Sequence, residues 1–327
     1  MPAVHHPDDE AKSSFDVVVV GEALVDIVVS PRGTVEHPGG SPANVAYGLG
    51  RLGVATGLLT SIGDDHYASE IEKHLQTAGV HLLPGSQVPG TTATATAVLA
   101  SNGSAQYDFD IRWDLPRIAP ATLPKVLHTG SIATFLAPGA TVVRELLEQS
   151  HKRCVVTYDP NIRPALLGSQ SEAKIIFEEL VPITEVVKLS DEDALWLYPR
   201  LSLEDISKRV LALGAGLAVV TMGAEGSLLT TRGAQVVVPS VKSAVVDTIG
   251  AGDSYMSALI YGLLMRGADG LAPSVLESLG RMASKAAAIT VRRPGAQPPT
   301  SEELRAEPPE HQAVASVTSH ACALVQG

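Results

Sequence analysis

The chain has 327 residues, of which 45% are hydrophobic and 18% charged, and its formal net charge is -11 at pH 7. This composition is that of a globular protein, large enough for one elaborated α/β domain or two ordinary domains. The excess of acids would repel a phosphate backbone, and no run of Lys and Arg offsets it locally. We therefore expect no nucleic-acid partner.

The early part of the chain shows no membrane or secretory signal. Its most apolar stretch, 17–29, is interrupted by Glu22 and Asp26, whereas a spanning helix needs roughly 20 apolar residues in a row. No basic segment leads into it, as a signal peptide would require. The two cysteines, Cys154 and Cys322, have no metal-binding or redox spacing. We expect a cytoplasmic protein that has no membrane partner.

The predicted elements alternate between strand and helix along most of the chain. Residues 1–14 are too polar to order themselves and are predicted to be a tail. The alternation after them predicts a mainly parallel sheet flanked by helices. Strands are predicted over 16–20, 24–29, 57–60, 126–130, 154–159, 186–188 and 217–221, and helices over 41–52, 65–78 and 140–150 and from Gly250 and Pro273.

Two stretches interrupt this alternation. Residues 28–37 and 91–113 are predicted to form β-ribbons, and the second alternates strongly before a turn at Asn102-Gly103. Strands inserted between βα units predict a small sheet that stands off the main domain as a lid.

The segment 247–254, Asp-Thr-Ile-Gly-Ala-Gly-Asp-Ser, carries the clearest chemical signal. Small residues at Gly250, Ala251 and Gly252 let consecutive backbone N–H groups converge, and the following helix points its positive end at the same place. This pattern predicts an anion hole. Asp253 can then accept the proton of a hydroxyl beside bound phosphates. A helix-capping acid after a glycine turn explains Asp253 equally well from these residues alone.

The segment resembles the D-T-x-G-A-G-D signature of the PfkB, or ribokinase-like, carbohydrate kinases. Gly-Gly-Ser-Pro-Ala-Asn-Val-Ala at 39–46 is similar to a second signature of that family, as are residues 50–53 and 62–65. The resemblance implies a ribokinase-like α/β domain with a β-lid over 15–304 and a C-terminal tail over 305–327. It also implies that the γ-phosphoryl group of Mg-ATP is transferred to a sugar hydroxyl, with Asp253 as the catalytic base.

The sugar site that the resemblance implies lies in the first part of the chain. Asp26 resembles the aspartate that accepts hydrogen bonds from sugar hydroxyls, and Gly39, Gly40 and Asn44 would form the rest of that surface. Without the resemblance, Asp26 is a solvent-facing strand residue and Asn44 an ordinary polar residue of a helix. Glycines would let the backbone approach the sugar closely.

The nucleotide site involves two other segments. Asn161 and Arg163 follow a predicted buried strand, and α/β enzymes place ligands at the carboxyl ends of such strands. A plain turn is the alternative interpretation. The resemblance implies that Asn161 lies near the phosphates and Arg163 near the sugar. Thr221, Gly223 and Gly226 resemble the family's turn beside adenine and ribose, and a β-turn between strands is compatible with that role.

Two further segments bear on metal ions. Residues 188–193 are similar to the family's N-x-x-E element, which implies nucleotide contacts for Lys188 and Ser190 and a water-mediated Mg²⁺ contact for Asp193. The chain departs from that element, because Ser190 replaces the Asn and Asp193 the Glu. Asp247 and the loop 292–296 resemble the site of a monovalent cation. The expected cofactors are ATP and Mg²⁺, with K⁺ as a further possibility.

The resemblance is greatest to the fructokinase branch, through residues 21–26, 39–44 and 159–163. We expect fructose to be converted to fructose 6-phosphate, with ribose, 2-keto-3-deoxygluconate or a nucleoside as alternative substrates. The lid residues Tyr107, Phe109 and Trp113 are expected to contact or cover the sugar. Exposed lid edges also predict a homodimer.

Two alternative functions from other classes of protein remain open. A non-catalytic sugar-binding regulator of the same fold would retain binding without turnover. A dehydrogenase is suggested only by Gly-x-Gly-x-x-Gly at 48–53, which lies within a predicted helix instead of directly after a strand. No P-loop sequence occurs in the chain.

Overall fold

The structure is a computed structural model of the chain, and it describes residues 15–30, 33–99, 105–117, 123–266 and 270–306. The predicted N-terminal tail, nearly all of the predicted C-terminal tail and the turn at Asn102-Gly103 lie outside these residues. Within the described part, no helix combines the length and the apolar character needed to cross a membrane.

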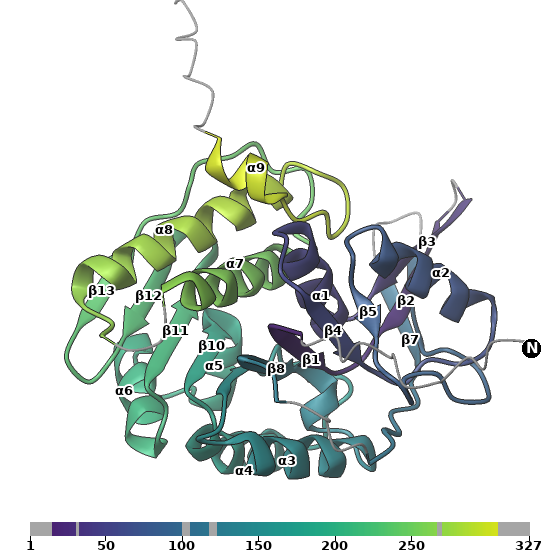
Figure 1. Ribbon diagram of the computed structural model, residues 1–327, viewed down its shortest axis with the longest axis horizontal. Helices are drawn as coiled ribbons and strands as arrows, with labels where there is room; N and C mark the ends of the chain where they lie inside the picture. The colour runs from purple at the N-terminus through teal and green to yellow at the C-terminus, as the bar shows by residue number, and fades with distance from the viewer. Residues whose placement is uncertain (1–14, 31–32, 100–104, 118–122, 267–269, 307–327) are drawn as a thin grey trace, which may run out of the picture.

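A large sheet forms the centre of the molecule (Figure 1). Its described strands run in the order β13-β12-β11-β10-β9-β8-β1-β4-β5, and those from β11 to β5 are parallel, whereas β12 and β13 are antiparallel to their neighbours. The predicted mainly parallel sheet is confirmed. The strands are β1 Val17–Val20, β4 Thr56–Leu59, β5 His81–Leu82, β8 Val126–Gly130, β9 Val155–Asp159, β10 Val186–Ser190, β11 Leu217–Thr221, β12 Ser227–Thr230 and β13 Gln235–Val238.

Helices cover both faces of this sheet, and each face has its own hydrophobic core. Val17 and Val19 of β1 belong to one core, and Val18 and Val20 belong to the other, because successive strand residues point to opposite faces. The first core is closed by α1 Ser41–Arg51, α2 His66–Gln76, α7 Ala251–Arg266, α8 Pro273–Thr290 and α9 Ser301–Arg305. The second is closed by α3 Gly139–Ser150, α4 Gln170–Leu180, α5 Asp191–Leu197 and α6 Leu203–Leu213.

The second sheet is the predicted lid, which stands at one side of the main domain (Figure 1). Its order is β3-β2-β6-β7, formed by β2 Leu24–Ser30, β3 Gly33–Gly39, β6 Thr94–Leu99 and β7 Ala105–Asp110. The first ribbon is longer than the predicted 28–37, because the strand expected separately over 24–29 is one of its two strands. The lid-mediated homodimer stays a prediction.

Trp113 is not a lid residue, and that part of the prediction is wrong. The lid strand β7 ends at Asp110, and the chain then enters the main domain, where the Trp113 ring is buried in the second core. Its indole N–H donates a hydrogen bond to the carbonyl oxygen of Ala133 at 3.0 Å. Phe109 does lie on the lid, opposite Ala95, and the side chain of Tyr107 lies outside the described part.

Two of the three glycines at 48–53 serve the packing of α1. Gly48 and Gly50 lie inside α1, and a Cβ on Gly48 would approach Ser257 Oγ of α7 to 2.5 Å. A Cβ on Gly50 would lie 2.4 Å from the carbonyl oxygen of Ala78. The element thus lets α1 approach its neighbours closely, and it does not open a helix after a strand, as a dinucleotide site requires.

Gly48→Val should lower the free energy of unfolding by about 1–3 kcal/mol, because the added methyl groups overpack the contact between α1 and α7. Urea unfolding followed by circular dichroism measures the change. Gly233→Val is the matched control, since a Cβ at Gly233 would contact nothing within 4 Å. Equal stability of the two variants would contradict the packing role of Gly48.

Candidate active site

Loops from neighbouring parallel strands meet at one edge of the large sheet. Gly130 at the end of β8 pairs with Asp159 at the end of β9, and Ser190 at the end of β10 pairs with Thr221 at the end of β11. Carboxyl ends of parallel strands are where open α/β sheets bind ligands. The segments predicted from 159, 188 and 221 onward are therefore brought to one side of the molecule.

Asp253 lies in the first turn of α7, and another helix holds its carboxylate. Ser41 Oγ donates a hydrogen bond to Asp253 Oδ1 at 2.6 Å, and Asn44 Nδ2 donates to Oδ2 at 2.9 Å. Both donors come from the first turns of α1. The Asp253 carboxylate is therefore held by donors from α1.

Burial raises the pKa of Asp253, and four groups oppose the rise. The hydrogen bonds from Ser41 and Asn44 favour the carboxylate, as do the positive charges of Lys188 and Arg163. A general base must be ionised and must also be able to accept a proton. A pKa that burial raises and that hydrogen-bond donors and positive charges lower is compatible with both conditions.

The backbone before Asp253 has the form expected of an anion hole. Gly250 has φ of +73°, a left-handed conformation, and α7 begins directly after it at Ala251. A Cβ on Gly250 would lie 2.5 Å from the Cβ of Ala296, so only glycine fits this turn. The N–H of Ala251 donates to the carbonyl oxygen of Thr248 at 3.2 Å, so the N–H groups of Gly252 and Asp253 are the ones that the start of α7 could offer to an anion.

A buried ion pair lies beneath this turn. Lys188 Nζ donates to Asp159 Oδ2 at 2.6 Å, and both side chains are almost fully buried. A Cβ on Gly252 would be 3.5 Å from Lys188 Nζ, so the ammonium is close to the start of α7. Burial raises the pKa of Asp159, and the charge and hydrogen bond of Lys188 oppose the rise.

His128 lies near this pair and stays neutral. Its Nδ1 is 2.9 Å from Thr157 Oγ1, and burial together with the charge of Lys188 lowers the pKa of His128 to about 3. The positive charge beside the Asp159 carboxylate is therefore that of Lys188, not that of His128. The Lys188 ammonium, which was predicted to contact the nucleotide, is already paired with Asp159.

Asp193 connects the loop after β9 to the helix after β10. Its Oδ1 accepts the N–H of Ile162 at 2.9 Å, and its Oδ2 accepts the N–H of Ser190 at 3.2 Å. Ser190 Oγ accepts the N–H of Asp193 in return, which makes a capping box for α5. Ser190 and Asp193, the two residues that depart from the N-x-x-E element, therefore form a mutually hydrogen-bonded pair. Asn161, which precedes Ile162 in the chain, has φ of +37°.

The charges of Asp26, Arg163 and Asp253 act on one another across the boundary between lid and main domain. Burial raises the pKa of Asp26 to about 6, with the positive charge of Arg163 opposing and the negative charge of Asp253 adding to the rise. Arg163 Nη1 also donates to the carbonyl oxygen of Ile162 at 3.1 Å. A Cβ on Gly39 would lie 2.1 Å from Asp26 Oδ2, so glycine leaves room for this carboxylate.

Two residues of the site were not assigned from the sequence. Ser41 stands in the quoted 39–46 segment, and its position at the start of a helix beside Asn44 was the available signal. Glu22 follows β1, is buried, and accepts the N–H of Ala133 at 3.3 Å. Burial raises the pKa of Glu22 to about 8, so it holds a proton at neutral pH. Gly40, at φ of +97°, packs against the carbonyl of Glu22.

The remaining predicted residues lie in tight turns. Gly223 and Gly226 have φ of +51° and +99°, and the N–H of Met222 donates to the carbonyl oxygen of Gly226 at 2.8 Å directly after Thr221. Asp247 Oδ2 accepts the N–H of Gly295 at 2.8 Å, which joins the segment before α7 to the loop after α8. The described residues contain no cluster of three metal-ligating side chains.

The chain was compared with known proteins. The family described as pfkB family carbohydrate kinase matches residues 14–303. A fructokinase of Rhizobium leguminosarum bv. trifolii is 31% identical over 261 residues, covering 76% of this chain and 80% of the relative. A Vibrio cholerae O395 fructokinase solved with fructose, ADP and potassium ion has a TM-score of 0.77 at 24% identity, covering 89% and 98% of the two chains.

A third relative differs in substrate. An aminoimidazole riboside kinase of Salmonella enterica, solved with aminoimidazole riboside and an ATP analogue, has a TM-score of 0.75 at 23% identity and covers 88% of this chain and 98% of that chain. Its likeness shows a shared fold. Together with the family match, these neighbours confirm the predicted ribokinase-like architecture.

Lys188→Met should lower the free energy of unfolding by about 3–5 kcal/mol, because it leaves the carboxylate of Asp159 buried without a counter-charge. The double variant Lys188→Met with Asp159→Asn should recover much of this loss, and urea unfolding at pH 7 measures both. Lys125→Met removes an exposed ion pair with Asp16 and should cost less than about 1 kcal/mol. A double variant no more stable than Lys188→Met would contradict the pairing.

Proposed function

The chain belongs to the pfkB family of carbohydrate kinases, and from this premise we propose that it transfers the γ-phosphoryl group of ATP to fructose, forming fructose 6-phosphate. The observation that carries the proposal is the Asp253 carboxylate, held by Ser41 and Asn44 beside the N-terminus of α7. A base next to an anion site is what phosphoryl transfer to a hydroxyl requires.

The sugar would lie between the lid and α1. Asp26 and Asn44 supply a carboxylate and an amide at this boundary, and Gly39 and Gly40 would complete this surface while leaving room for the Asp26 carboxylate and the Glu22 carbonyl. Arg163, whose charge acts on both Asp26 and Asp253, would face the reacting end of the sugar. The sugar hydroxyl would lose its proton to Asp253 as its oxygen attacks the γ-phosphorus and the bond to ADP breaks.

The nucleotide would lie over the ends of β9, β10 and β11. The amides after Gly250 would hold the transferring phosphoryl group, and Asn161 and Ser190 would lie along the other phosphates. The turn at Thr221, Gly223 and Gly226 would contact adenosine. Lys188 would act mainly through its charge, because its ammonium is bonded to Asp159.

The residues at this edge fit a magnesium ion held through water and phosphate. Carboxylate oxygens suit Mg²⁺, which keeps several of its waters, and Asp159 Oδ1 is buried and has no hydrogen-bond partner among the described residues. Asp193 also presents a carboxylate there. When bound, the ion would neutralise negative charge on the phosphates. A monovalent cation would lie near Asp247 and the loop that includes Gly295.

Fructose is favoured over other sugars by the 31% identical fructokinase relative and by the fructose-bound structural neighbour. The riboside kinase neighbour makes a riboside the leading alternative. A non-catalytic regulator is disfavoured, because Asp253, its two donors and the Gly250 turn are all intact.

The test is ADP formation with Mg-ATP and a panel of fructose, ribose, glucose, 2-keto-3-deoxygluconate and nucleosides. Fructose should give the highest kcat/KM, and Asp253→Asn should lower kcat by about 10²–10⁴, the usual contribution of a general base. Asp205→Asn, at the first turn of α6, is a matched control that should retain activity. Preference for another sugar would contradict fructose as the substrate but would leave the kinase activity standing. Sugar binding without turnover would support a non-catalytic sugar-binding regulator.

Ser41→Ala should move the acid limb of the kcat/KM profile to higher pH. The Ser41 hydrogen bond stabilises the Asp253 carboxylate, so its removal raises the pKa of the base, and a larger fraction is protonated and inactive at a given acidic pH. Direct chromatography of ADP between pH 5 and 9 avoids coupling enzymes. Ser69→Ala, an exposed hydroxyl on α2, should leave the profile unchanged. An unshifted limb in Ser41→Ala would contradict this account of the base.

A further inference from the structure

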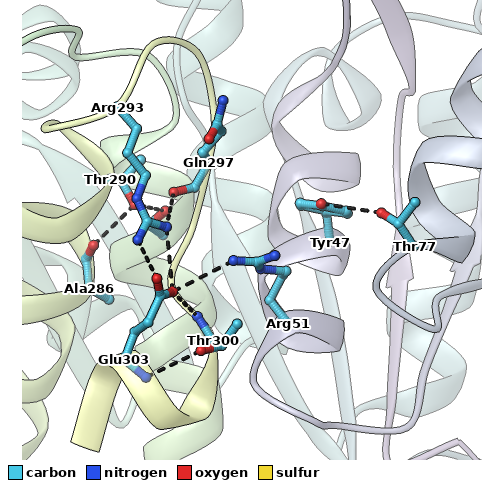
Figure 2. A network of polar contacts seen from close by, with 10 residues as sticks. Tyr47, Arg51, Thr77, Ala286, Thr290, Arg293, Gln297, Thr300 and Glu303 are labelled. Carbon is cyan, nitrogen blue, oxygen red and sulfur yellow. Dashed lines mark hydrogen bonds and ion pairs between the residues drawn. The ribbon is translucent and has the colours of Figure 1, made fainter. Parts of the chain in front are cut away.

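Glu303 joins the end of α1, which is far away in the sequence, to the loop after α8 and to the start of its own helix α9 (Figure 2). Its Oε1 accepts a hydrogen bond from Arg293 Nη2 at 2.5 Å, and its Oε2 accepts the backbone N–H of Thr300 at 2.8 Å. The same Oε2 lies 3.6 Å from Arg51 Nη2. One carboxylate therefore holds the end of α1, the loop after α8 and the start of α9.

The hydrogen bond with Arg293 connects Glu303 to the loop that packs against the predicted anion hole. Arg293 begins the loop in which the Gly295 N–H donates to Asp247 Oδ2 at 2.8 Å. Ala296 of the same loop lies against Gly250, where an added Cβ would be 2.5 Å from the Ala296 Cβ. The wall behind the Gly250 turn is thus the loop that Glu303 anchors through Arg293.

The ion pair with Arg51 connects Glu303 to α1, the helix that holds Asp253. Arg51 is the last residue of α1, and Ser41 and Asn44, which hold Asp253, lie at the other end of this 11-residue helix. At about 1.5 Å rise per residue, roughly 15 Å separates these ends. Glu303 is therefore remote from the chemistry but bonded to both supports of the α7 N-terminus.

Attraction between opposite charges, more than burial, holds the side chains of Arg51, Arg293 and Glu303 together. Hydrogen bonds from Thr300 and Arg293 and the charge of Arg51 lower the pKa of Glu303 against the effect of burial, so it is ionised at neutral pH. The side chains of Arg51, Arg293 and Glu303 are 30%, 26% and 40% exposed. Pairs this exposed contribute little to global stability, so their main effect is on where the segments lie.

We propose that Glu303 is a positioning residue for phosphoryl transfer, which fixes the loop 293–297 and α1 against α7 so that the anion hole and Asp253 keep their relative placement. The inference rests on the proposed function. The competing role is a local one, because Glu303 also completes the capping box of α9 with Thr300. Glu303→Gln separates the two roles: glutamine retains an oxygen for the Thr300 N–H but loses the charge that attracts both arginines.

Kinetics and backbone hydrogen exchange on the full chain test this proposal. Glu303→Gln should lower kcat about tenfold, with the KM for the sugar changed less than twofold, because small misplacements of reacting groups reduce turnover steeply. Peptides covering 245–250 and 293–297 should exchange faster in the variant. Arg293→Gln should behave alike, and the double variant should be no worse than either single change, because both remove one interaction.

Glu277→Gln is the matched control, since it breaks an exposed pair with Arg281 on α8 and should change neither readout. Unchanged kcat and unchanged exchange in Glu303→Gln would overturn the proposal and leave Glu303 as a helix cap. Hydrogen exchange does not depend on turnover. If no sugar is phosphorylated by the wild type, the proposed function fails while exchange at 245–250 still decides whether Glu303 holds the turn.

Discussion

The structure depends most on the contact between the Asp253 carboxylate and the first turns of α1. A buried carboxylate is costly unless its oxygens are hydrogen-bonded, and Ser41 and Asn44 supply a donor to each oxygen. The contact brings together the N-termini of α1 and α7, which are more than 200 residues apart in the sequence, since Ser41 and Asp253 are separated by 212 positions. Everything else in the site is arranged around this junction of two helices, including the lid strand that leads into α1 and the loop that supports Gly250.

The described residues of the site carry an excess of negative charge, which Lys188 and Arg163 partly offset. Asp26, Asp159 and Asp253 all have pKa values raised by burial, and Lys188 and Arg163 oppose the rise. Such a site suits a substrate that arrives with its own positive ion, because the ion would relieve the repulsion among the carboxylates. A formal net charge of -11 does not exclude a local anion site, because the positive field of a helix N-terminus is strongest close to the helix end.

The alternation of strands and helices was enough to predict the parallel sheet, and the small residues before Asp253 predicted a turn into a helix, which begins at Ala251. Local patterns of this kind report local geometry. Contacts between distant segments leave no such pattern, so neither the Ser41 bond to Asp253 nor the pairing of Lys188 with Asp159 could be read from spacing. Trp113 was misplaced for a related reason, because the sequence does not mark where the chain leaves the lid and enters the core.

One pair of connections between the lid and the main domain lies beside Asp253. The chain leaves the large sheet at Val20 and returns to the main domain at Ser41, which donates a hydrogen bond to Asp253. The two connections touch each other: a Cβ on Gly21 would lie 2.3 Å from Pro42 Cγ, and one on Gly40 would lie 2.6 Å from the carbonyl oxygen of Glu22. A change in lid position therefore acts first on the segment that bears Asp26 and on the start of α1. Because the start of α1 also holds Asp253, the placement of Asp26 and the placement of Asp253 depend on one shared piece of backbone.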